Sequence, residues 1–571
     1  MSDTAAPLVE IDGLTFRYRR ATEPAIRDLS LTIAAGEVLL VAGPSGCGKS
    51  TLIRAMNGLI PHAYRGDLAG SVRVAGRLTT ELRLRELARI VGTVLQDPAK
   101  QLIASTIRGE LAFGPENLAM PVDEIEATMD AVVPRAGIGH LLDRTTDQLS
   151  GGESQQIAVA GALMLEPQLV VLDEPLANLD PAAAHRLLGL VRTLADSGTA
   201  VVIVEHRVED ALAAAPDRVL YLDGGMERYL GPLSGFFEVA DPTRVKLPFP
   251  VVLARARANA TDTGPPATSG RHEAAAPAPS GSGSGEAPRL EWRGVDAGYD
   301  GRPVLRGVSA ALGARETVAV LGPNGSGKTT LFKSAIGLIP RTAGTVLVDG
   351  TSTERRSVAD LAGTFGYVFQ NPSQMLFAPN VREELLFGPR NMRRDAGGFD
   401  ALVTTSLRRV GLDTEDGIEA RPPLTLSFGQ QKRLALAVAL ALEPRTLVLD
   451  EPSAGQDHRS ATAFMTEVER IVGLESVYFV THDVDLALTY ADRIVLLRDG
   501  QIVADGAPLD VIRDRDRWVA CNLRVTSLMD ANAAWEAHTG RFLGAQELAR
   551  QLVEHERTER GRQLHGGREH S

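Results

Sequence analysis

Short apolar runs recur along the chain, and several of them show no alternation between polar and apolar positions. Residues 38–42 (VLLVA) and 169–172 (LVVL) are examples. A strand with one solvated face alternates in polarity, whereas a strand covered on both faces of a parallel sheet is apolar throughout. Helix-like stretches lie between these runs. The pattern predicts an α/β fold built on a mainly parallel sheet.

The apolar stretches are too short to cross a membrane. The longest are residues 157–165 and 434–442, whereas a spanning helix needs roughly 20 residues. The first residues, MSDTAAPLVEIDG, lack the basic start and the apolar core of a signal peptide. We therefore expect a cytoplasmic protein that reaches the inner face of a cell membrane only through a partner.

The chain contains an internal repeat that covers most of its length. GPSGCGKS at residues 43–50 recurs as GPNGSGKT at residues 322–329. An apolar run followed by Asp-Glu-Pro ends at Pro175 and again at Pro452, and a later histidine recurs at a similar distance. Because these separate landmarks keep one spacing to within a few residues, the sequence indicates a duplicated domain.

The repeat divides the chain into four segments. We expect the first copy of the domain at 1–255, a linker at 256–288, the second copy at 289–520 and a C-terminal extension at 521–571. Residues 260–288 contain no large apolar residue and are rich in Pro, Gly, Ser and Ala, which is typical of a flexible tether. An ordered loop is the alternative. The extension has a helix-like stretch near residues 545–555, followed by a charged end that we expect to be disordered.

The composition and the net charge of the chain disfavour several classes of function. The formal net charge of -12 disfavours a general nucleic-acid binder, because such proteins carry a basic excess or a basic stripe. The two cysteines, Cys47 and Cys521, exclude a disulfide framework and a cysteine-rich metal site. The eleven histidines include no closely spaced pair on a helix-like stretch, so a zinc site has little support.

The glycine-rich repeat has the pattern GxxxxGK[ST] of a phosphate-binding loop. Glycines let the backbone wrap closely around phosphates and point its N–H groups inward at the start of a helix. Lys49 and Lys328 would reach the β- and γ-phosphates, and Ser50 and Thr329 would hold Mg²⁺. Each loop follows an apolar run and precedes a helix-like segment, which is the context that this motif requires. We therefore predict two sites for ATP and Mg²⁺.

A pair of carboxylates follows a later apolar run in each copy. The first of the pair, Asp173 or Asp450, would enter the Mg²⁺ shell. The second, Glu174 or Glu451, would act as the general base on the attacking water. A single Asp-Glu pair at a strand end is usually an ordinary solvated turn. Its position downstream of a phosphate-binding loop favours the catalytic interpretation.

Two further segments resemble the signature sequence of the ABC (ATP-binding cassette) family. They are LSGGESQQ at residues 149–156 and LSFGQQKR at residues 426–433, each shortly before a carboxylate pair. The resemblance covers residues 8–240 and 289–515. It implies two P-loop NTPase domains, each with a mainly parallel sheet, flanking helices, an antiparallel β subdomain and a helical subdomain.

Other elements of the family pattern follow in the same order in both copies. They are the adenine-stacking tyrosines Tyr18 and Tyr299, the Q-loop glutamines Gln96 and Gln370, the D-loop aspartates Asp180 and Asp457, and the switch histidines His206 and His482. Alone, such a tyrosine is usually a packing residue and such a histidine usually lies on the surface. The ordered series, present twice, favours the functional interpretation.

The resemblance and the loop motif together predict the site residues. In the loops, the predicted ATP-binding residues are Gly43, Pro44, Ser45, Gly46, Cys47, Gly48, Lys49, Ser50, Thr51, Gly322, Pro323, Asn324, Gly325, Ser326, Gly327, Lys328, Thr329 and Thr330. In the signature segments, they are Ser150, Gly151, Gly152, Ser427, Phe428 and Gly429. The predicted catalytic residues are Gln96, Glu174, His206, Gln370, Glu451 and His482. The predicted metal ligands are Ser50, Gln96, Asp173, Thr329, Gln370 and Asp450.

The signature explains why two copies are present. A serine and glycines at a helix N-terminus can contact a γ-phosphate, and in the family this segment completes the nucleotide site of the other domain. Ser427 would thus complete the first site, and Ser150 the second. ATP would join the halves, and hydrolysis would release them. Two departures, Phe428 for the usual glycine and Glu153 for the usual glutamine, keep the serine and the second glycine.

The segment after each Q-loop glutamine indicates a particular subgroup of the ABC family. It reads LQDPAKQLIASTIRGELAFGPENLAMP in the first copy and FQNPSQMLFAPNVREELLFGPRNM in the second. This pattern resembles the ATPases of energy-coupling-factor (ECF) importers, in which two cassettes drive a transmembrane T component that works with a substrate-binding S component. Such importers take up vitamins, vitamin precursors, or nickel and cobalt ions. The fused arrangement is similar to ATPases assigned to thiamine-precursor uptake, although the S component selects the cargo.

The same segment contains acidic residues on the expected membrane-facing helices. Glu110, Glu116, Glu383 and Glu384 could receive arginines from a coupling helix of the T component, because paired Arg–carboxylate contacts fix orientation. A solvated acidic face is the alternative. On the docking hypothesis, Glu384→Arg would abolish transport and leave basal ATP hydrolysis intact.

A rival function is that of a soluble translation factor of the ABC-F type, which also fuses two cassettes. Such proteins carry a long charged helical linker that reaches ribosomal RNA, whereas residues 260–288 here are rich in Pro, Gly and Ser and contain one arginine. A DNA-repair or chromosome-maintenance ATPase would contain an inserted zinc module or a long coiled coil, and the sequence shows neither. The importer is the function that the sequence favours.

Overall fold

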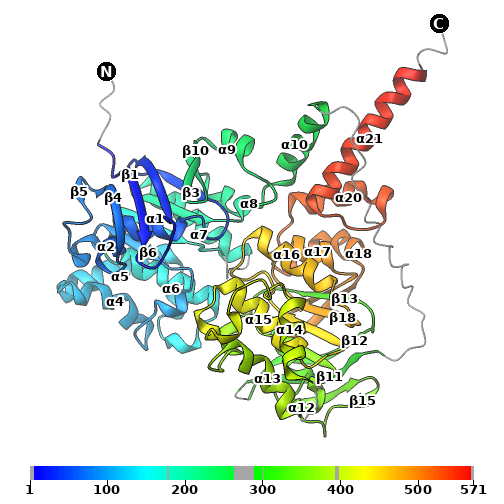
Figure 1. Ribbon diagram of the computed structural model, residues 1–571. Coiled ribbons are helices and arrows are strands. Elements are labelled where there is room, and N and C mark those ends of the chain that lie inside the picture. Colours follow the sequence, from blue (N-terminus) through cyan, green and yellow to red (C-terminus); the bar gives the residue numbers. More distant parts are fainter. Residues whose placement is uncertain are drawn as a thin grey trace. The chain divides into compact units, whose positions relative to one another are not determined.

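The computed structural model describes residues 6–176, 179, 181–262, 288–299, 301–392 and 398–566 (Figure 1). Most of the predicted linker, the last residues of the predicted C-terminal extension and the D-loop residue Asp180 lie outside these described residues. The chain divides into two compact units, Met1–Leu247 with Gln456–Arg459 and Pro248–Gly455 with Ser460–Ser571. Each unit contains one copy of the sequence repeat.

A six-stranded sheet forms the centre of the first unit, in the order β10-β9-β3-β8-β7-β6. Its strands are β3 (Val38–Ala42), β6 (Val91–Val94), β7 (Leu169–Asp173), β8 (Ala200–Glu205), β9 (Arg218–Asp223) and β10 (Met226–Gly231). Neighbouring strands are parallel except for β9 and β10. The strands β3 and β8 are buried along their whole length, which agrees with their apolar sequences.

The second unit contains an equivalent sheet, in the order β16-β17-β18-β13-β19-β20. Its strands are β13 (Thr317–Leu321), β16 (Phe365–Val368), β17 (Thr446–Asp450), β18 (Ser476–Val480), β19 (Arg493–Arg498) and β20 (Gln501–Gly506). Only β19 and β20 pair in antiparallel fashion. The predicted α/β class with a mainly parallel sheet is confirmed in both halves.

A smaller antiparallel sheet accompanies each large one, as the family resemblance implies. The first has the order β2-β1-β4-β5 and the second β12-β11-β14-β15. Their strands are β1 (Val9–Tyr18), β2 (Ile26–Ile33), β4 (Gly66–Val74), β5 (Arg77–Leu78), β11 (Leu290–Tyr299), β12 (Arg302–Leu312), β14 (Arg341–Val348) and β15 (Thr351–Ser352). In each half, buried residues of both sheets form one hydrophobic core, which holds the phosphate-binding loop's helix in place.

Helices surround the sheets of both halves. Those of the first half are α1 (Lys49–Met56), α2 (Leu59–His62), α3 (Leu84–Leu87), α4 (Ile107–Asn117), α5 (Val122–Ala136), α6 (Gly151–Leu163), α7 (Pro181–Asp196), α8 (Val208–Ala211) and α9 (Leu233–Val239). Those of the second half are α11 (Lys328–Ala335), α12 (Val358–Ala362), α13 (Val381–Asn391), α14 (Phe399–Arg409), α15 (Phe428–Leu440), α16 (His458–Glu469), α17 (Val484–Tyr490) and α18 (Pro508–Arg513). The helices α4, α5 and α6 pack on one another, as do α13, α14 and α15, and form the helical subdomains.

The remaining helices belong to the second unit. They are α10 (Phe249–Asp262), α19 (Arg515–Ala520), α20 (Ser527–Thr539) and α21 (Ala545–Gly566). The helix α10 runs past the predicted start of the linker at residue 256 and packs on α20 and α21. The Phe249 backbone N–H donates to Ser527 Oγ at 2.8 Å, and Arg257 pairs with Glu556. Within the described part of the chain, none of the helices combines the length and the hydropathy that a bilayer-spanning segment requires.

Candidate functional site

The phosphate-binding loops connect a central strand of the large sheet to a helix in both halves. The first lies between β3 and α1, and the second between β13 and α11. Glycine is required at the first position of each loop, because a Cβ atom on Gly43 would lie 2.3 Å from the Leu222 carbonyl oxygen and one on Gly322 would lie 2.0 Å from that of Leu497. The predicted loop residues 43–51 and 322–330 therefore form tight turns that lead into a helix N-terminus, where N–H groups can bind an anion.

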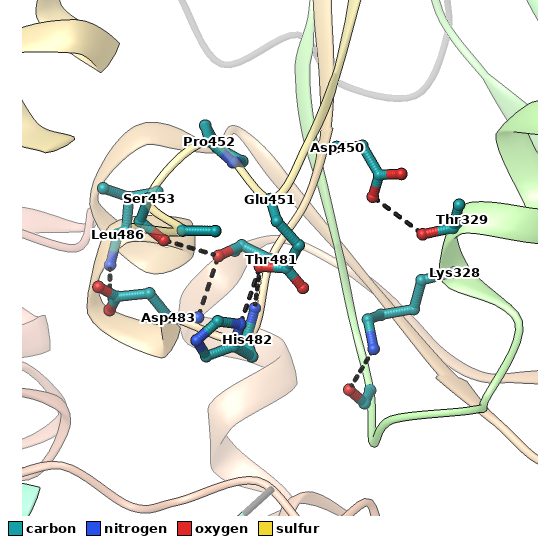
Figure 2. Close-up of polar contacts among 12 residues, drawn as sticks. Lys328, Thr329, Asp450, Glu451, Pro452, Ser453, Thr481, His482, Asp483 and Leu486 are labelled. Carbon is teal, nitrogen blue, oxygen red and sulfur yellow. Dashed lines mark hydrogen bonds and ion pairs between the residues drawn. The ribbon is translucent and has the colours of Figure 1, made fainter. Parts of the chain in front are cut away.

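The loop lysines already fold inward. Lys49 Nζ donates to the carbonyl oxygens of Gly43 at 2.7 Å and Pro44 at 2.8 Å. Lys328 Nζ makes the same two contacts in the second half, to Gly322 at 2.8 Å and Pro323 at 2.9 Å. Figure 2 shows one of these contacts. Each loop is thus organised around its ammonium group, which phosphate oxygens can reach when ATP binds.

The predicted metal-binding aspartates lie at the carboxyl ends of β7 and β17. Thr329 Oγ1 donates to Asp450 Oδ1 at 2.9 Å, as Figure 2 shows, and Ser50 Oγ lies 3.4 Å from Asp173 Oδ2. Burial and the neighbouring Glu174 raise the pKa of Asp173 to about 6. Burial and Glu451 raise the pKa of Asp450 in the same direction. The fold therefore places each aspartate where a cation would favour its ionised form.

A tyrosine that the sequence analysis did not identify also contacts this group in the second half. Tyr367, on β16, donates its hydroxyl to Asp450 Oδ2 at 2.9 Å. The equivalent residue on β6 is Thr93, which instead accepts from Asn57 Nδ2 at 3.3 Å. The signal for Tyr367 is a polar-tipped aromatic residue inside an otherwise apolar strand that precedes the Q-loop glutamine, but it has no counterpart in the first half.

The predicted general bases occupy a special backbone position. Glu174 has a φ of 47° and Glu451 a φ of 51°, in the left-handed region that side chains other than glycine seldom adopt. Each is anchored by its backbone N–H, which donates to Val204 O or to Val480 O at 2.9 Å. Such strain persists only where the surrounding structure over-determines it, and it is typical of functional sites.

The side chains of the two glutamates have different partners. Glu451 Oε2 lies 2.8 Å from His482 Nδ1 and accepts from the His482 backbone N–H at 3.2 Å (Figure 2). Glu174 Oε2 accepts from Gln96 Nε2 at 2.7 Å, whereas its Oε1 lies 3.7 Å from His206 Nδ1. The structure thus brings glutamate, switch histidine and Q-loop glutamine together in the first half. In the second half Gln370 is exposed and lies outside this set of contacts.

The electrostatic environment keeps both glutamates ionised. Burial acts to raise the pKa of each, but the switch histidine and the loop lysine outweigh it and hold the pKa below the usual value. An ionised carboxylate that is desolvated and oriented by a histidine can accept a proton from water. The neighbouring aspartate has its pKa shifted in the opposite direction, so that the two adjacent carboxylates have distinct chemical properties.

The signature segments begin helices in both halves. Ser150 is the N-cap of α6 and forms a capping box with Glu153, and Ser427 is the N-cap of α15 and forms one with Gln430. The substitution of glutamate for glutamine therefore preserves the local geometry. Phe428 takes the first helical position, where its side chain is partly exposed, and Gly151, Gly152 and Gly429 complete the first turns.

The two predicted adenine-stacking tyrosines lie at the ends of β1 and β11. Tyr18 has its hydroxyl 3.1 Å from Thr51 Oγ1 and accepts from Arg54 Nη1 at 2.7 Å, so it lies directly beside the first phosphate-binding loop. The ring of Tyr64 packs edge-on against it. Tyr299 is exposed at the end of β11. Arg54 and Tyr64 are additional residues at this end of the loop that the sequence motifs did not indicate.

The acidic residues proposed as docking points are placed differently from the expectation. Glu384 is 1% exposed, and its Oε2 accepts the backbone N–H groups of Phe377 and Ala378, both at 2.7 Å. Glu110 makes the equivalent contacts in the first half, to the backbone N–H groups of Ile103 at 2.8 Å and Ala104 at 2.7 Å. The hypothesis that Glu384 meets a partner's arginine is therefore wrong, because its carboxylate is buried and bonded within its own subdomain.

The other two acidic residues of that hypothesis lie at the surface. Glu383 pairs with Arg390 on the same helix, and Glu116 is exposed near the end of α4.

Comparisons with known proteins identify a family and several similar proteins. The profile of the ABC transporter family matches residues 26–177 and 305–454, one segment in each half. A "Putative ABC transporter ATP-binding protein" of Methanosarcina mazei is 34% identical over 535 residues, which is 89% of this chain and 90% of that protein. A protein of the same description from Streptococcus mutans is 32% identical over 537 residues, or 92% of this chain and 95% of that protein. The solved structure of cbiO1 from Clostridium perfringens, described as part of the ABC transporter complex cbiONQ, is 31% identical and covers 42% of this chain and 96% of that chain, with a TM-score of 0.37.

Replacing Asp173 with Asn should stabilise the nucleotide-free protein. Folding raises the pKa of this carboxyl group to about 6, so the folded state is more stable when the group is protonated than when it is ionised. This stability is lost as the pH rises through about 6. At about pH 7.5 and without nucleotide, we expect Tm to rise by roughly 2–4 °C. The difference should shrink at about pH 5, where the wild-type carboxyl group is protonated. The exposed Asp143→Asn serves as the control, and a lower Tm for Asp173→Asn would contradict the electrostatic account.

Glu384→Arg should destabilise the second helical subdomain and not act selectively on transport. The substitution removes the acceptor of two backbone N–H groups and buries a cation beside them, at a cost of at least about 3 kcal/mol. Urea unfolding followed by circular dichroism measures the change. The adjacent Glu383→Arg is the matched control, since its side chain is at the surface and should cost less than about 1 kcal/mol. Equal stability of the two variants would show that the buried contacts contribute little.

Proposed function

The chain belongs to the ABC transporter family, and from that membership we propose that it is the ATP-hydrolysing subunit of an importer of the energy-coupling-factor type. Its two ABC domains bind ATP and hydrolyse it, and an ABC transporter ATP-binding protein works with transmembrane partners. The proposal adds the type of importer, the roles of the site residues, the metal ion and the location. We place the protein at the cytoplasmic face of the cell membrane, held there by its partners.

We assign the metal ion as Mg²⁺. The chemistry of the donors fits, because a hydroxyl group and a carboxylate lie together at the end of each phosphate-binding loop, and Mg²⁺ prefers such oxygen ligands. Ser50 with Asp173, and Thr329 with Asp450, would hold it. Bound Mg²⁺ supplies charge neutralisation on the β- and γ-phosphates. Gln96 is close to Glu174 and can join the first ligand set, whereas Gln370 would have to move inward to join the second.

In the proposed reaction each glutamate serves as the general base. Lys49 and Lys328 hold the phosphate chain, and Glu174 and Glu451 accept the proton of the attacking water. In the second half, His482 contacts one carboxylate oxygen of Glu451, Oε2, through its ring (Figure 2). The histidine thereby fixes the orientation of the base. The fold thus orients the general base before the substrate binds.

We further propose that each signature segment completes the site of the other half. Ser150 and Ser427 cap helices whose first N–H groups can bind an anion, and each cap is already formed. ATP would then join the halves, and the closing motion would be transmitted to the membrane partner. The Pro/Gly/Ser-rich linker is long enough for such pairing within one chain.

The observation that carries the importer assignment is a repeated apolar surface beside each Q-loop. Because Glu110 and Glu384 hold the loop backbone, Ile103 and Phe377 project outward and are 67% and 64% exposed. The following helices α4 and α13 expose Phe113 and Phe387, and the rings of Phe377 and Phe387 meet edge-on at 4.8 Å. Exposed aromatic pairs of this kind are typical of a binding surface.

This surface supports docking by a largely apolar helix of the T component. The sequence suggested docking through arginine–carboxylate contacts. We replace that hypothesis with docking on the apolar surface, because Glu110 and Glu384 bind the backbone of their own loops. The T component would work with an S component that binds the cargo, which we expect to be a vitamin, a vitamin precursor or a transition-metal ion. The sequence pattern after each Q-loop and the tandem cassettes support this assignment.

Substituting both aromatic residues of the second surface should release the membrane partner. We expect Phe377→Ala combined with Phe387→Ala to lower recovery of a polytopic membrane protein, in affinity purification from native membranes, by at least about tenfold. Basal ATP hydrolysis should stay within about twofold, since neither residue belongs to the phosphate-binding loop or to the carboxylate pair. Quantitative mass spectrometry of the purified complex measures the recovery.

Val472→Ala is the control for this experiment, because Val472 is an exposed apolar residue elsewhere in the second half. Full recovery of the membrane protein with the double variant would contradict the docking surface. Recovery of ribosomes in place of a membrane protein would support the translation-factor alternative.

A further inference from the structure

The turn after each catalytic glutamate is held by a buried charged residue to which the sequence analysis assigned no role. In the second half this residue is Lys432, on α15, which is 1% exposed. Its Nζ donates to the carbonyl oxygens of Glu451 at 3.2 Å and Ala454 at 3.1 Å, and also to that of Pro452. All three N–H bonds of the ammonium group are therefore directed at the turn that begins with the general base.

The position of this ammonium group is unusual for a lysine. Burial lowers its pKa to about 7, although the charge of Glu451 opposes the shift. The rings of Phe428 and Phe464 lie 6.0 and 5.9 Å from Nζ. A cation so far removed from water is retained only where its hydrogen bonds are satisfied, and here the acceptors all belong to one turn.

The first half lacks this contact. Gln155 occupies the position equivalent to Lys432 in the signature segment and is also buried. Among the described residues, its Nε2 has no hydrogen-bond partner. Residues 174–176, the described start of the turn after Glu174, therefore receive no hydrogen bond from this amide nitrogen.

A residue of opposite charge holds the first turn instead. Glu205, at the end of β8, is 1% exposed and accepts the Leu176 backbone N–H at 3.1 Å and the His206 backbone N–H at 3.3 Å. Arg207 donates to the Leu176 carbonyl oxygen at 2.7 Å. The equivalent of Glu205 in the second half is Thr481, whose Oγ1 lies 3.5 Å from Ser453 Oγ. The two turns are thus fixed by different elements, a strand end in one half and the signature helix in the other.

We propose that Lys432 is the positioning residue of Glu451 and that Glu205 is the positioning residue of Glu174, so that separate side chains set the hydrolysis rates of the two ATP sites. The proposal rests on the general-base role assigned to the two glutamates. Glu451 is strained at a φ of 51°, and Lys432 binds its own carbonyl oxygen, so loss of Lys432 lets the base relax from its orientation.

The arrangement also connects two functional segments within the second half. Ser427 begins the helix that contains Lys432, so the signature segment and the general base are joined by one side chain. Any shift of the start of α15 is passed directly to residues 451–454. In the first half the corresponding connection runs from the switch histidine, because Glu205 is bonded to the backbone of His206.

Single-turnover hydrolysis in full-length variants tests this assignment. Lys432→Gln gives the second half the side chain that the first half accommodates at the same buried position. In a chain that also carries Glu174→Gln, where only the second site keeps its base, we expect the rate of hydrolysis of bound radiolabelled ATP to fall at least about tenfold. The affinity for ATP should stay within about twofold, because the lysine does not contact the nucleotide loop.

The complementary variants make the test specific for one site. In a chain that carries Glu451→Gln, Lys432→Gln should change the rate by less than about twofold, whereas Glu205→Thr should lower it at least about tenfold. Gln155→Met is the control and should leave both rates unchanged. If Lys432→Gln does not fold, Lys432→Met provides the same comparison.

Three results would overturn the proposal: unchanged rates, equal losses in both backgrounds, or a loss of ATP affinity in step with the rate. Continued hydrolysis by the Glu174→Gln, Glu451→Gln double variant would instead remove the general-base assignment itself. The two failures are therefore distinguishable.

Discussion

The central constraint in each half is the placement of two adjacent carboxylates in a desolvated position at the carboxyl end of a parallel strand. Hydration would stabilise both charges, but burial in the fold excludes water from them. The aspartate responds with a raised pKa, and the glutamate remains ionised through its histidine and the loop lysine. The surrounding structure, from the glycine turns to the buried strands, holds this unfavourable arrangement in place, and bound ATP with the proposed Mg²⁺ would compensate it.

The construction of the site explains why stability and catalysis are separated in space. Both hydrophobic cores lie between the large and the small sheet, and they are built from apolar side chains of the strands and the loop helix. The strands end where the chemistry begins, so the groups that cost stability are confined to one edge. This division lets the edge carry strained and charged residues without loss of the fold.

The sequence was informative wherever function depends on residues that are close along the chain. The phosphate-binding loops, the carboxylate pairs and the helix-capping serines could be predicted, because each is a short pattern with its own backbone requirements. The burial of Glu384 could not be predicted, because two adjacent acidic residues in a sequence usually indicate an exposed position. Only the folded loop shows the two backbone N–H groups that donate to its carboxylate. Tyr367, Glu205 and Lys432 were missed because their partners lie far away in sequence and differ between the halves. The position of Gln370 outside the second site could not be foreseen either, since the motif fixes the residue type and not the conformation of its loop.

Two complete nucleotide sites per chain are the basis of this account, and the number of bound nucleotides tests it most directly. Equilibrium dialysis of the Glu174→Gln, Glu451→Gln variant with radiolabelled ATP and Mg²⁺ should give a stoichiometry of two ATP molecules per chain. A saturating value of one would contradict the account, because it would mean that one of the two loop-and-carboxylate groups does not bind ATP.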